Sequence, residues 1–200
     1  WRRDGAGHHH YGPVAVDAAA DLLTPDDLMS GRRPEGSEAV IFDDDHYYLA
    51  SVLAELLVKS GTKVTYVTPA SVAAAYTVNT MEQKLIQARL IELGVVIHAG
   101  QALSAVTAQG LVTTCVYTGK ERRHETADAV LVTSRQADDA LYRDLRQRGA
   151  PVTAIGDAWA PAAIVHAVYA GRRFAEEFDT KPRDVLEVPF RREMIELAGA

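Results

Sequence analysis

A continuous apolar run that ends in three aspartates constrains the fold of this chain more than any other stretch. The run Ala39–Phe42 leads into Asp43-Asp44-Asp45, and apolar residues then recur at helical spacing from Leu49 to Leu57. A short strand without polar alternation is typical of a parallel sheet that is covered on both faces. We therefore predict a βα unit with the aspartates in the turn between strand and helix.

The same alternation of strand and helix continues to His98. Gly61 ends the first helix, and Val64–Thr68 is a second strand that Pro69 stops, so residues 39–68 form a predicted right-handed βαβ crossover. A helix over about 79–93, closed by Gly94, leads to a third strand at Val95–His98.

The pattern then changes to short β-rich segments. These segments are separated by Gly110 and Gly119, and they cover Ala102–Val106, Leu111–Tyr117 and Lys120–Glu125. This spacing indicates an antiparallel meander, and Asp128–Thr133 then returns to the buried parallel pattern. The predicted fold class is α/β: a Rossmann-like parallel sheet flanked by helices with an inserted antiparallel β-meander, as in FAD- and NAD(P)-binding domains.

Elements outside this block are shorter and more polar. Thr24-Pro25-Asp26-Asp27 has the hydroxyl, proline and acids of a helix start. Beyond Ser134, we predict a helix over Asp138–Arg148, a strand over Val152–Ile155 that ends in Gly156-Asp157, and a helix over Pro161–Phe178.

Composition excludes several classes of function. The chain has 200 residues, 48% of them hydrophobic, and a net charge of −6, which gives no reason to expect nucleic acid or an anionic membrane. No apolar run approaches the roughly 20 residues that span a bilayer, so we expect a cytoplasmic protein without membrane partners. The first residue is Trp1, and we expect the chain to be part of a longer polypeptide.

The three aspartates admit several interpretations. They can cap the following helix, which is worth about 0.3–1 kcal/mol for each acid. Alternatively, Asp43 and Asp45 form the D-x-D pattern of a haloacid-dehalogenase-type phosphatase, with one acid as nucleophile and the other as proton shuttle beside Mg²⁺. Against this second interpretation, residues 134–151 contain no lysine to balance the charge, and Ala160 and Pro161 stand where a further acid is needed.

A third interpretation is a dinucleotide site that has lost its ligand. Such a site needs glycines in the first turn and an acid at the end of the second strand, whereas this chain has Asp43–His46 and Thr68-Pro69. Carboxylates repel phosphate, so we expect NAD(P) binding to be lost or weakened. His46 beside the acids could complete a metal site, but a hydrogen-bonded histidine at the start of the helix is the favoured interpretation, and we assign no metal ligands.

The residues of this turn also carry a family resemblance. The run Val40–Tyr48, with Leu53–Leu57 behind it, resembles the trimethylamine dehydrogenase branch of the flavin oxidoreductases, which includes the dimethylamine and histamine dehydrogenases. Further matches lie along nearly the whole chain, at Trp1–Gly5, Leu23–Met29, Val64–Pro69, Asn79–Gln83, Ile86–Leu90, Leu131–Arg135 and Ile155–Pro161.

The resemblance implies a long flavoenzyme. Its N-terminal TIM barrel would carry FMN and a 4Fe-4S cluster, and two Rossmann-like domains would follow. Cys115 is the single cysteine and cannot ligate a cluster, so the barrel and its cofactors would lie upstream of Trp1. Residues 1–35 would be a linker with a short helix, 36–135 a degenerate NAD(P)-binding-like domain, and 136–200 the returning strand and helix of an FAD- or ADP-binding-like domain with a C-terminal tail.

The resemblance also implies what the piece itself does. We expect no catalytic residue and no cofactor within it, except that Gly156 and Asp157 would lie near the pyrophosphate or ribose of ADP or FAD. The parent would oxidise an amine C–N bond at FMN. Expected partners are the upstream barrel and nucleotide domain, with an electron-transfer flavoprotein and a second copy of the chain as further candidates. An NAD(P)H-dependent dienoyl-CoA-reductase-like domain, the phosphatase and a non-enzymatic binding module remain the alternatives.

Overall fold

A computed structural model describes residues 1–126 and 128–178. The chain divides into two units, Trp1–Ser134 (unit 1) and Arg135 onward (unit 2), which are described separately. Within the described ranges, no helix has both the length and the apolar character needed to cross a membrane.

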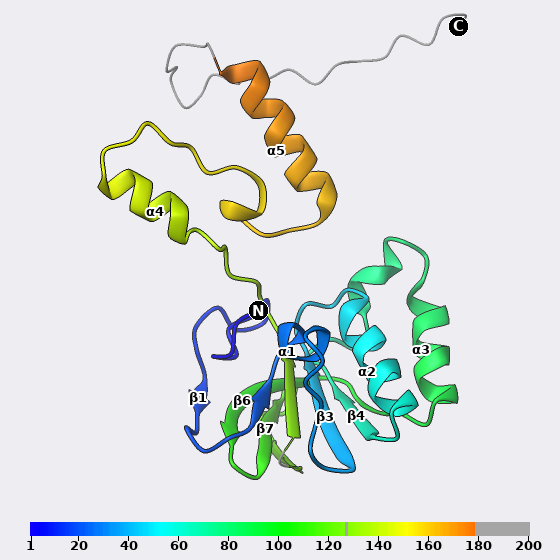
Figure 1. Ribbon diagram of the computed structural model, residues 1–200. Helices are drawn as coiled ribbons and strands as arrows, with labels where there is room; N and C mark the ends of the chain where they lie inside the picture. Colours follow the sequence, from blue (N-terminus) through cyan, green and yellow to red (C-terminus); the bar gives the residue numbers. More distant parts are fainter. Residues whose placement is uncertain (127, 179–200) are drawn as a thin grey trace, which may run out of the picture. The chain divides into compact units, whose positions relative to one another are not determined.

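A parallel sheet of five strands forms the centre of unit 1 (Figure 1). Its strands lie in the order β2 (Leu22–Leu23), β9 (Asp128–Val132), β3 (Glu38–Asp43), β4 (Lys63–Val67) and β5 (Val96–His98). Strand β3 is hydrogen-bonded on both sides, with Ile41 opposite Val130 on one neighbour and Tyr66 on the other. The predicted parallel sheet is therefore confirmed, with the aspartates at the carboxyl end of a central strand.

Helices cover one face of this sheet. They are α1 (Pro25–Met29), α2 (Leu49–Lys59) and α3 (Gln83–Glu92), with a 3₁₀ turn η1 at Ala75–Val78. Alternate residues of the strands point to this face, so Ile41 and Tyr66 pack with Leu53 and Leu57 of α2 in one buried cluster. Helix α1 begins as predicted, because Thr24 and Asp27 form a capping box around Pro25.

An antiparallel sheet covers the opposite face. It contains β6 (Gln101–Thr107), β7 (Gly110–Cys115) and β8 (Glu121–Glu125), and β1 (Ala15–Val16) pairs with β6 in parallel. Val40 and Phe42, the residues of β3 that alternate with Ile41, pack here with Leu103 and Leu111. The predicted meander is confirmed, and the whole unit is a mixed α/β structure with one parallel and one antiparallel sheet.

The first 35 residues contribute more than the helix expected of a linker. They supply β1 to the antiparallel sheet and β2 to the parallel sheet, where Leu22 lies opposite Ala129. Each of these strands has only two residues, which is too short for the alternation that identifies a strand in a sequence.

Unit 2 contains α4 (Ala140–Gln147), a 3₁₀ turn η2 (Gly156–Ala158) and α5 (Ile164–Glu177). Both predicted helices are confirmed, but the strand predicted over Val152–Ile155 is wrong, because no strand forms there. A strand needs a neighbour for its hydrogen bonds, and the described part of unit 2 has no other strand. The tail beyond residue 178 lies outside the described residues.

Candidate functional site

The acidic turn, Asp43–His46, lies where β3 ends beside β9. The backbone N–H groups of Asp44 and Asp45 both donate to the carbonyl oxygen of Val132, the last residue of β9, at 2.8 and 3.1 Å. The side chains of Asp43 and Asp44 are buried, with exposed fractions of 0% and 1%. Two adjacent carboxyl groups are thus enclosed at the carboxyl end of the sheet.

Asp43 is enclosed by hydrogen bonds on both of its oxygens. Its Oδ1 accepts from the backbone N–H groups of Asp45 and His46 at 3.2 and 3.0 Å, and its Oδ2 accepts from the hydroxyl of Tyr66. The Tyr66 oxygen in turn accepts from the N–H of Ala74 at 3.2 Å. Burial raises the pKa of Asp43 to about 6, against the opposing effect of the Tyr66 hydrogen bond.

Asp44 is held from two sides. Its carboxylate accepts from the backbone N–H of His9 at 2.9 and 3.1 Å, and His46 Nε2 lies 3.0 Å from its Oδ1. Burial lowers the pKa of His46, but the hydrogen bond to Asp44 and the charges of Asp43, Asp44 and Asp45 outweigh this effect, so the pKa is raised. The hydrogen bond expected of His46 is present, but its expected place at a helix start is wrong, because α2 begins at Leu49.

The helix-cap interpretation of the aspartates is wrong. Helix α2 begins at Leu49 with Tyr48 as its N-cap, and its first turn contains no acid. Between β3 and α2 the chain passes through His46, whose φ is 60°. The carboxylate of Asp43 accepts a hydrogen bond from the N–H of His46, so it closes this turn and does not cap α2.

The geometry also bears on phosphatase and metal chemistry. Both oxygens of Asp43 accept hydrogen bonds, and its side chain has no exposed surface from which to attack a phosphate. Among the described residues, no group of three or more His, Cys, Asp or Glu side chains is placed to hold a metal ion.

A segment near the start of the chain covers the acidic turn. Residues 5–10, named here the strap, include buried Gly5, Ala6 and Gly7. A Cβ atom placed on Gly7 would lie 2.0 Å from Asp44 Oδ2, so the strap approaches the carboxylate more closely than any other residue type would permit. No local pattern connects His9 with Asp44 in the sequence, because their contact uses a backbone N–H group.

A second polar cluster lies between the two sheets. The rings of His98, at the end of β5, and His124, on β8, are 5.3 Å apart, and Thr113 Oγ1 lies 3.0 Å from His124 Nε2 and donates to Gln101. Burial lowers the pKa of His124 to about 4, with further lowering by the nearby His98 and Arg122. The cluster is neutral near pH 7, as a site between packed sheets requires.

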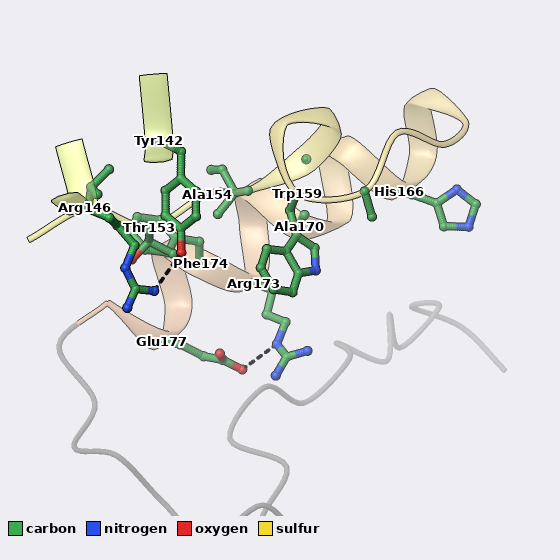
Figure 2. A pocket seen from close by; sticks show the side chains of 14 residues that line it. Tyr142, Arg146, Thr153, Ala154, Trp159, His166, Ala170, Arg173, Phe174 and Glu177 are labelled. Atoms are coloured by element: carbon green, nitrogen blue, oxygen red, sulfur yellow. Dashed lines mark hydrogen bonds and ion pairs between the residues drawn. The ribbon is translucent and has the colours of Figure 1, made fainter. Parts of the chain in front are cut away.

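Gly156 lies in unit 2 at a pocket of about 580 Å³, and Asp157 follows it in η2. Figure 2 shows this pocket with Tyr142, Trp159 and Arg173 among its labelled side chains. Gly156 lines the pocket together with Tyr142, Trp159 and Arg173, and its φ of 59° is in the left-handed region that favours glycine. Asp157 does not line it; its Oδ1 accepts from the N–H of Ala162 at 3.4 Å.

Comparisons with known proteins give consistent matches. A family model described as OYE-like second alpha/beta domain matches residues 23–137. Dimethylamine dehydrogenase from Hyphomicrobium sp. (strain x) is 30% identical over an alignment of length 223, which covers 96% of this chain and 30% of the dehydrogenase.

Solved structures extend this similarity. Histamine dehydrogenase from Rhizobium sp. 4-9 is 42% identical, with a TM-score of 0.87 over 98% of this chain and 32% of that chain. An amine oxidase for 6-hydroxypseudooxynicotine from Pseudomonas geniculata N1 is 33% identical, with a TM-score of 0.81 over 90% of this chain and 28% of that chain. The chain therefore spans about a third of the length of these relatives.

Proposed function

Because the chain belongs to the family of OYE-like second α/β domains, we propose that it is the C-terminal nucleotide-binding-like part of a flavin-dependent amine dehydrogenase. The observation that carries this proposal is the 42% identity to histamine dehydrogenase over 98% of the chain. The dimethylamine dehydrogenase match supports the same class of substrate, an amine whose C–N bond is oxidised.

In this proposal unit 1 is a Rossmann-like domain with a structural role. The turn after β3 is the place where a dinucleotide-binding domain presents glycines and free N–H groups to pyrophosphate. Here the N–H groups of Asp44 and Asp45 donate to Val132, and two buried carboxyl groups occupy the turn. These two N–H groups are therefore not free to bind a pyrophosphate.

The redox cofactors of the parent would be FMN and a 4Fe-4S cluster, as the resemblance implies, and both would be bound outside this chain. Cys115 is the one cysteine in the sequence, and a 4Fe-4S cluster needs four thiolate ligands. ADP or FAD would be held in part by Gly156, whose backbone lines the pocket of unit 2.

Unit 2 would pack against other parts of the parent polypeptide. None of its described residues is buried, and apolar side chains of α5 are largely exposed, including Ile164 at 83%, Val165 at 67% and Val168 at 65%. An apolar helix face of this kind is stable in water only when another surface covers it. The upstream barrel and nucleotide domain are the partners we propose.

Two measurements test the proposed function. The parent polypeptide that contains this chain should oxidise histamine or dimethylamine with a dye as electron acceptor, and NADH should not replace the amine as electron donor. Calorimetric titration of the 200-residue chain with NADH should show no binding. Saturable NADH binding that disappears in a variant of the acidic turn would contradict the structural role and favour the dienoyl-CoA-reductase-like alternative.

A further inference from the structure

The strap lies at the topological switch point of the parallel sheet, where the order of the strands reverses. From β3 the chain proceeds outward to β4 and β5, and it returns to β9 on the other side of β3. In open parallel α/β sheets, the crevice at the carboxyl ends of two such strands is where ligands bind. In this chain the acidic turn follows β3, and Thr133 and Ser134 follow β9.

Hydrogen bonds attach the strap and the residues before it to the end of β9. The N–H and the hydroxyl of Ser134 both donate to the carbonyl oxygen of Ala6, at 3.1 and 2.7 Å. Arg2 N donates to the carbonyl oxygen of Ser134 at 3.0 Å, and Thr133 Oγ1 donates to the carbonyl oxygen of Arg2 at 3.2 Å.

The end of β3 holds the other part of the strap. The N–H of His9 donates to both oxygens of Asp44, and Gly7 N donates to the carbonyl oxygen of His10 at 2.8 Å, which closes the strap on itself. The carboxylate of Asp44 thus has a backbone N–H on one side and the imidazole of His46 on the other. A phosphate oxygen in a nucleotide site accepts hydrogen bonds from donors of these kinds.

We propose that the strap is an internal plug of the switch-point crevice and that Asp44 supplies the anion that a dinucleotide pyrophosphate would otherwise supply. The crevice is then closed by contacts of the chain with itself, in addition to the repulsion between carboxylates and phosphate. The inference rests on the proposed function only in taking the turn to be free of dinucleotide.

Amide hydrogen exchange of the ¹⁵N-labelled 200-residue chain tests the plug residue by residue. If the strap is seated, the amides of His9 and Ser134 should exchange at least about tenfold more slowly than in an unfolded chain. In Asp44→Ala the His9 amide should lose this protection, because its acceptor is removed. Asp128→Ala is the matched control: Asp128 is also buried and accepts backbone N–H bonds, but from Glu35 and Gly36.

The same variant tests the anion position. In Asp44→Ala, inorganic pyrophosphate at millimolar concentration should shift the His9 amide resonance in a saturable way, whereas the native chain and Asp128→Ala should show no shift at His9. If Asp44→Ala does not fold, as judged by lost protection of the Ile41 amide, Gly7→Ala replaces it in the exchange test. The Cβ atom of this variant would force the strap away from Asp44, so the His9 amide should lose its protection, while the retained Asp44 carboxylate should still exclude pyrophosphate.

Several outcomes would overturn the plug. One is an unprotected His9 amide in the native chain, and another is the absence of any pyrophosphate shift in a folded Asp44→Ala variant. NADH binding to the native chain with strap protection unchanged would also reject it. NADH binding that removes the protection of the strap amides would support the plug and contradict the proposed function. Strap amides that are unprotected in a chain that does not bind NADH would reject the plug and leave the proposed function unchanged.

Discussion

The hydroxyl of Tyr66 donates a hydrogen bond to Oδ2 of Asp43, and neither side chain has any exposed surface. The pair joins two neighbouring strands of the parallel sheet just below the acidic turn. A buried carboxyl group destabilises the folded state unless neighbouring groups form hydrogen bonds with it. The stability of unit 1 and the pH dependence of that stability therefore depend on this pair.

Removing the tyrosine hydroxyl should destabilise unit 1. Tyr66→Phe leaves Asp43 Oδ2 and the N–H of Ala74 without their partner, which should cost about 1–3 kcal/mol in the free energy of unfolding. Urea denaturation at pH 7 measures this change. Tyr117→Phe is the control, because Tyr117 is 78% exposed and its variant should stay within about 0.5 kcal/mol of the native chain. Equal effects of the two substitutions would argue against the Tyr66–Asp43 pair.

The raised pKa of Asp43 makes the folded state less stable as the pH rises. Between the ordinary value of 3.8 and the native value of about 6, the folded chain keeps a proton that the unfolded chain has released. Stability therefore falls across this interval, by up to about 3 kcal/mol, and the loss is complete above pH 6. Asp43→Asn should remove this contribution. Between pH 4.5 and pH 7, the free energy of unfolding of the variant should therefore rise more, or fall less, than that of the native chain. An unchanged pH profile would contradict the raised pKa.

The lowered pKa of His124 acts in the opposite direction. Between about 4 and the ordinary value of 6.5, the unfolded chain binds a proton at this histidine and the folded chain does not, so stability rises with pH. His124→Gln keeps a polar group near Thr113 but cannot titrate, and it should be less sensitive to acid than the native chain. Thermal unfolding from pH 4 to 7 checks this, with the exposed His166→Gln as control. If His124→Gln loses as much stability in acid as the native chain, this result would count against the lowered pKa of His124.

Position 110, where β7 begins after the turn from β6, should tolerate only glycine. A Cβ atom on Gly110 would lie 2.0 Å from the carbonyl oxygen of His124, and the φ of this residue is 130°. Gly110→Ala should therefore cost more than about 2 kcal/mol in unfolding free energy, or prevent folding. Gly119→Ala is matched to it, because Gly119 also has a positive φ but nothing lies within 4 Å of its Cβ position. This control should lose only about 1 kcal/mol. Similar losses in both variants would show that the backbone conformation alone is decisive.

The sheet and helices of unit 1 could be predicted because each leaves a periodic pattern. The apolar run of β3 and the spacing of Leu53 and Leu57 on α2 are local signals, and tertiary packing agrees with them. The pattern at Val152–Ile155 has the same form but produced a wrong prediction. Whether such a segment pairs depends on a neighbouring strand, which the segment itself does not encode.

The acidic turn could be located from the sequence, but its contacts could not. Its three aspartates stand out after an apolar strand, whereas the partners of Asp43 and Asp44 are a core tyrosine, Tyr66, and a backbone N–H at His9. A tyrosine in a strand is typical of a core, and a backbone donor leaves no mark in a sequence. The error about helix capping arose because His46, in the left-handed conformation, delays the start of the helix, and this conformation is uncommon for residues other than glycine.

The hydrogen bond from Arg2 N to the carbonyl oxygen of Ser134 joins two segments that lie far apart in the sequence of unit 1. Thr133 Oγ1 donates to Arg2 as well, so the two segments are joined by more than one bond. Local opening at Arg2 therefore removes hydrogen bonds from the end of β9, and opening at Ser134 removes them from Arg2. The two segments should open and close together, as one cooperative unit.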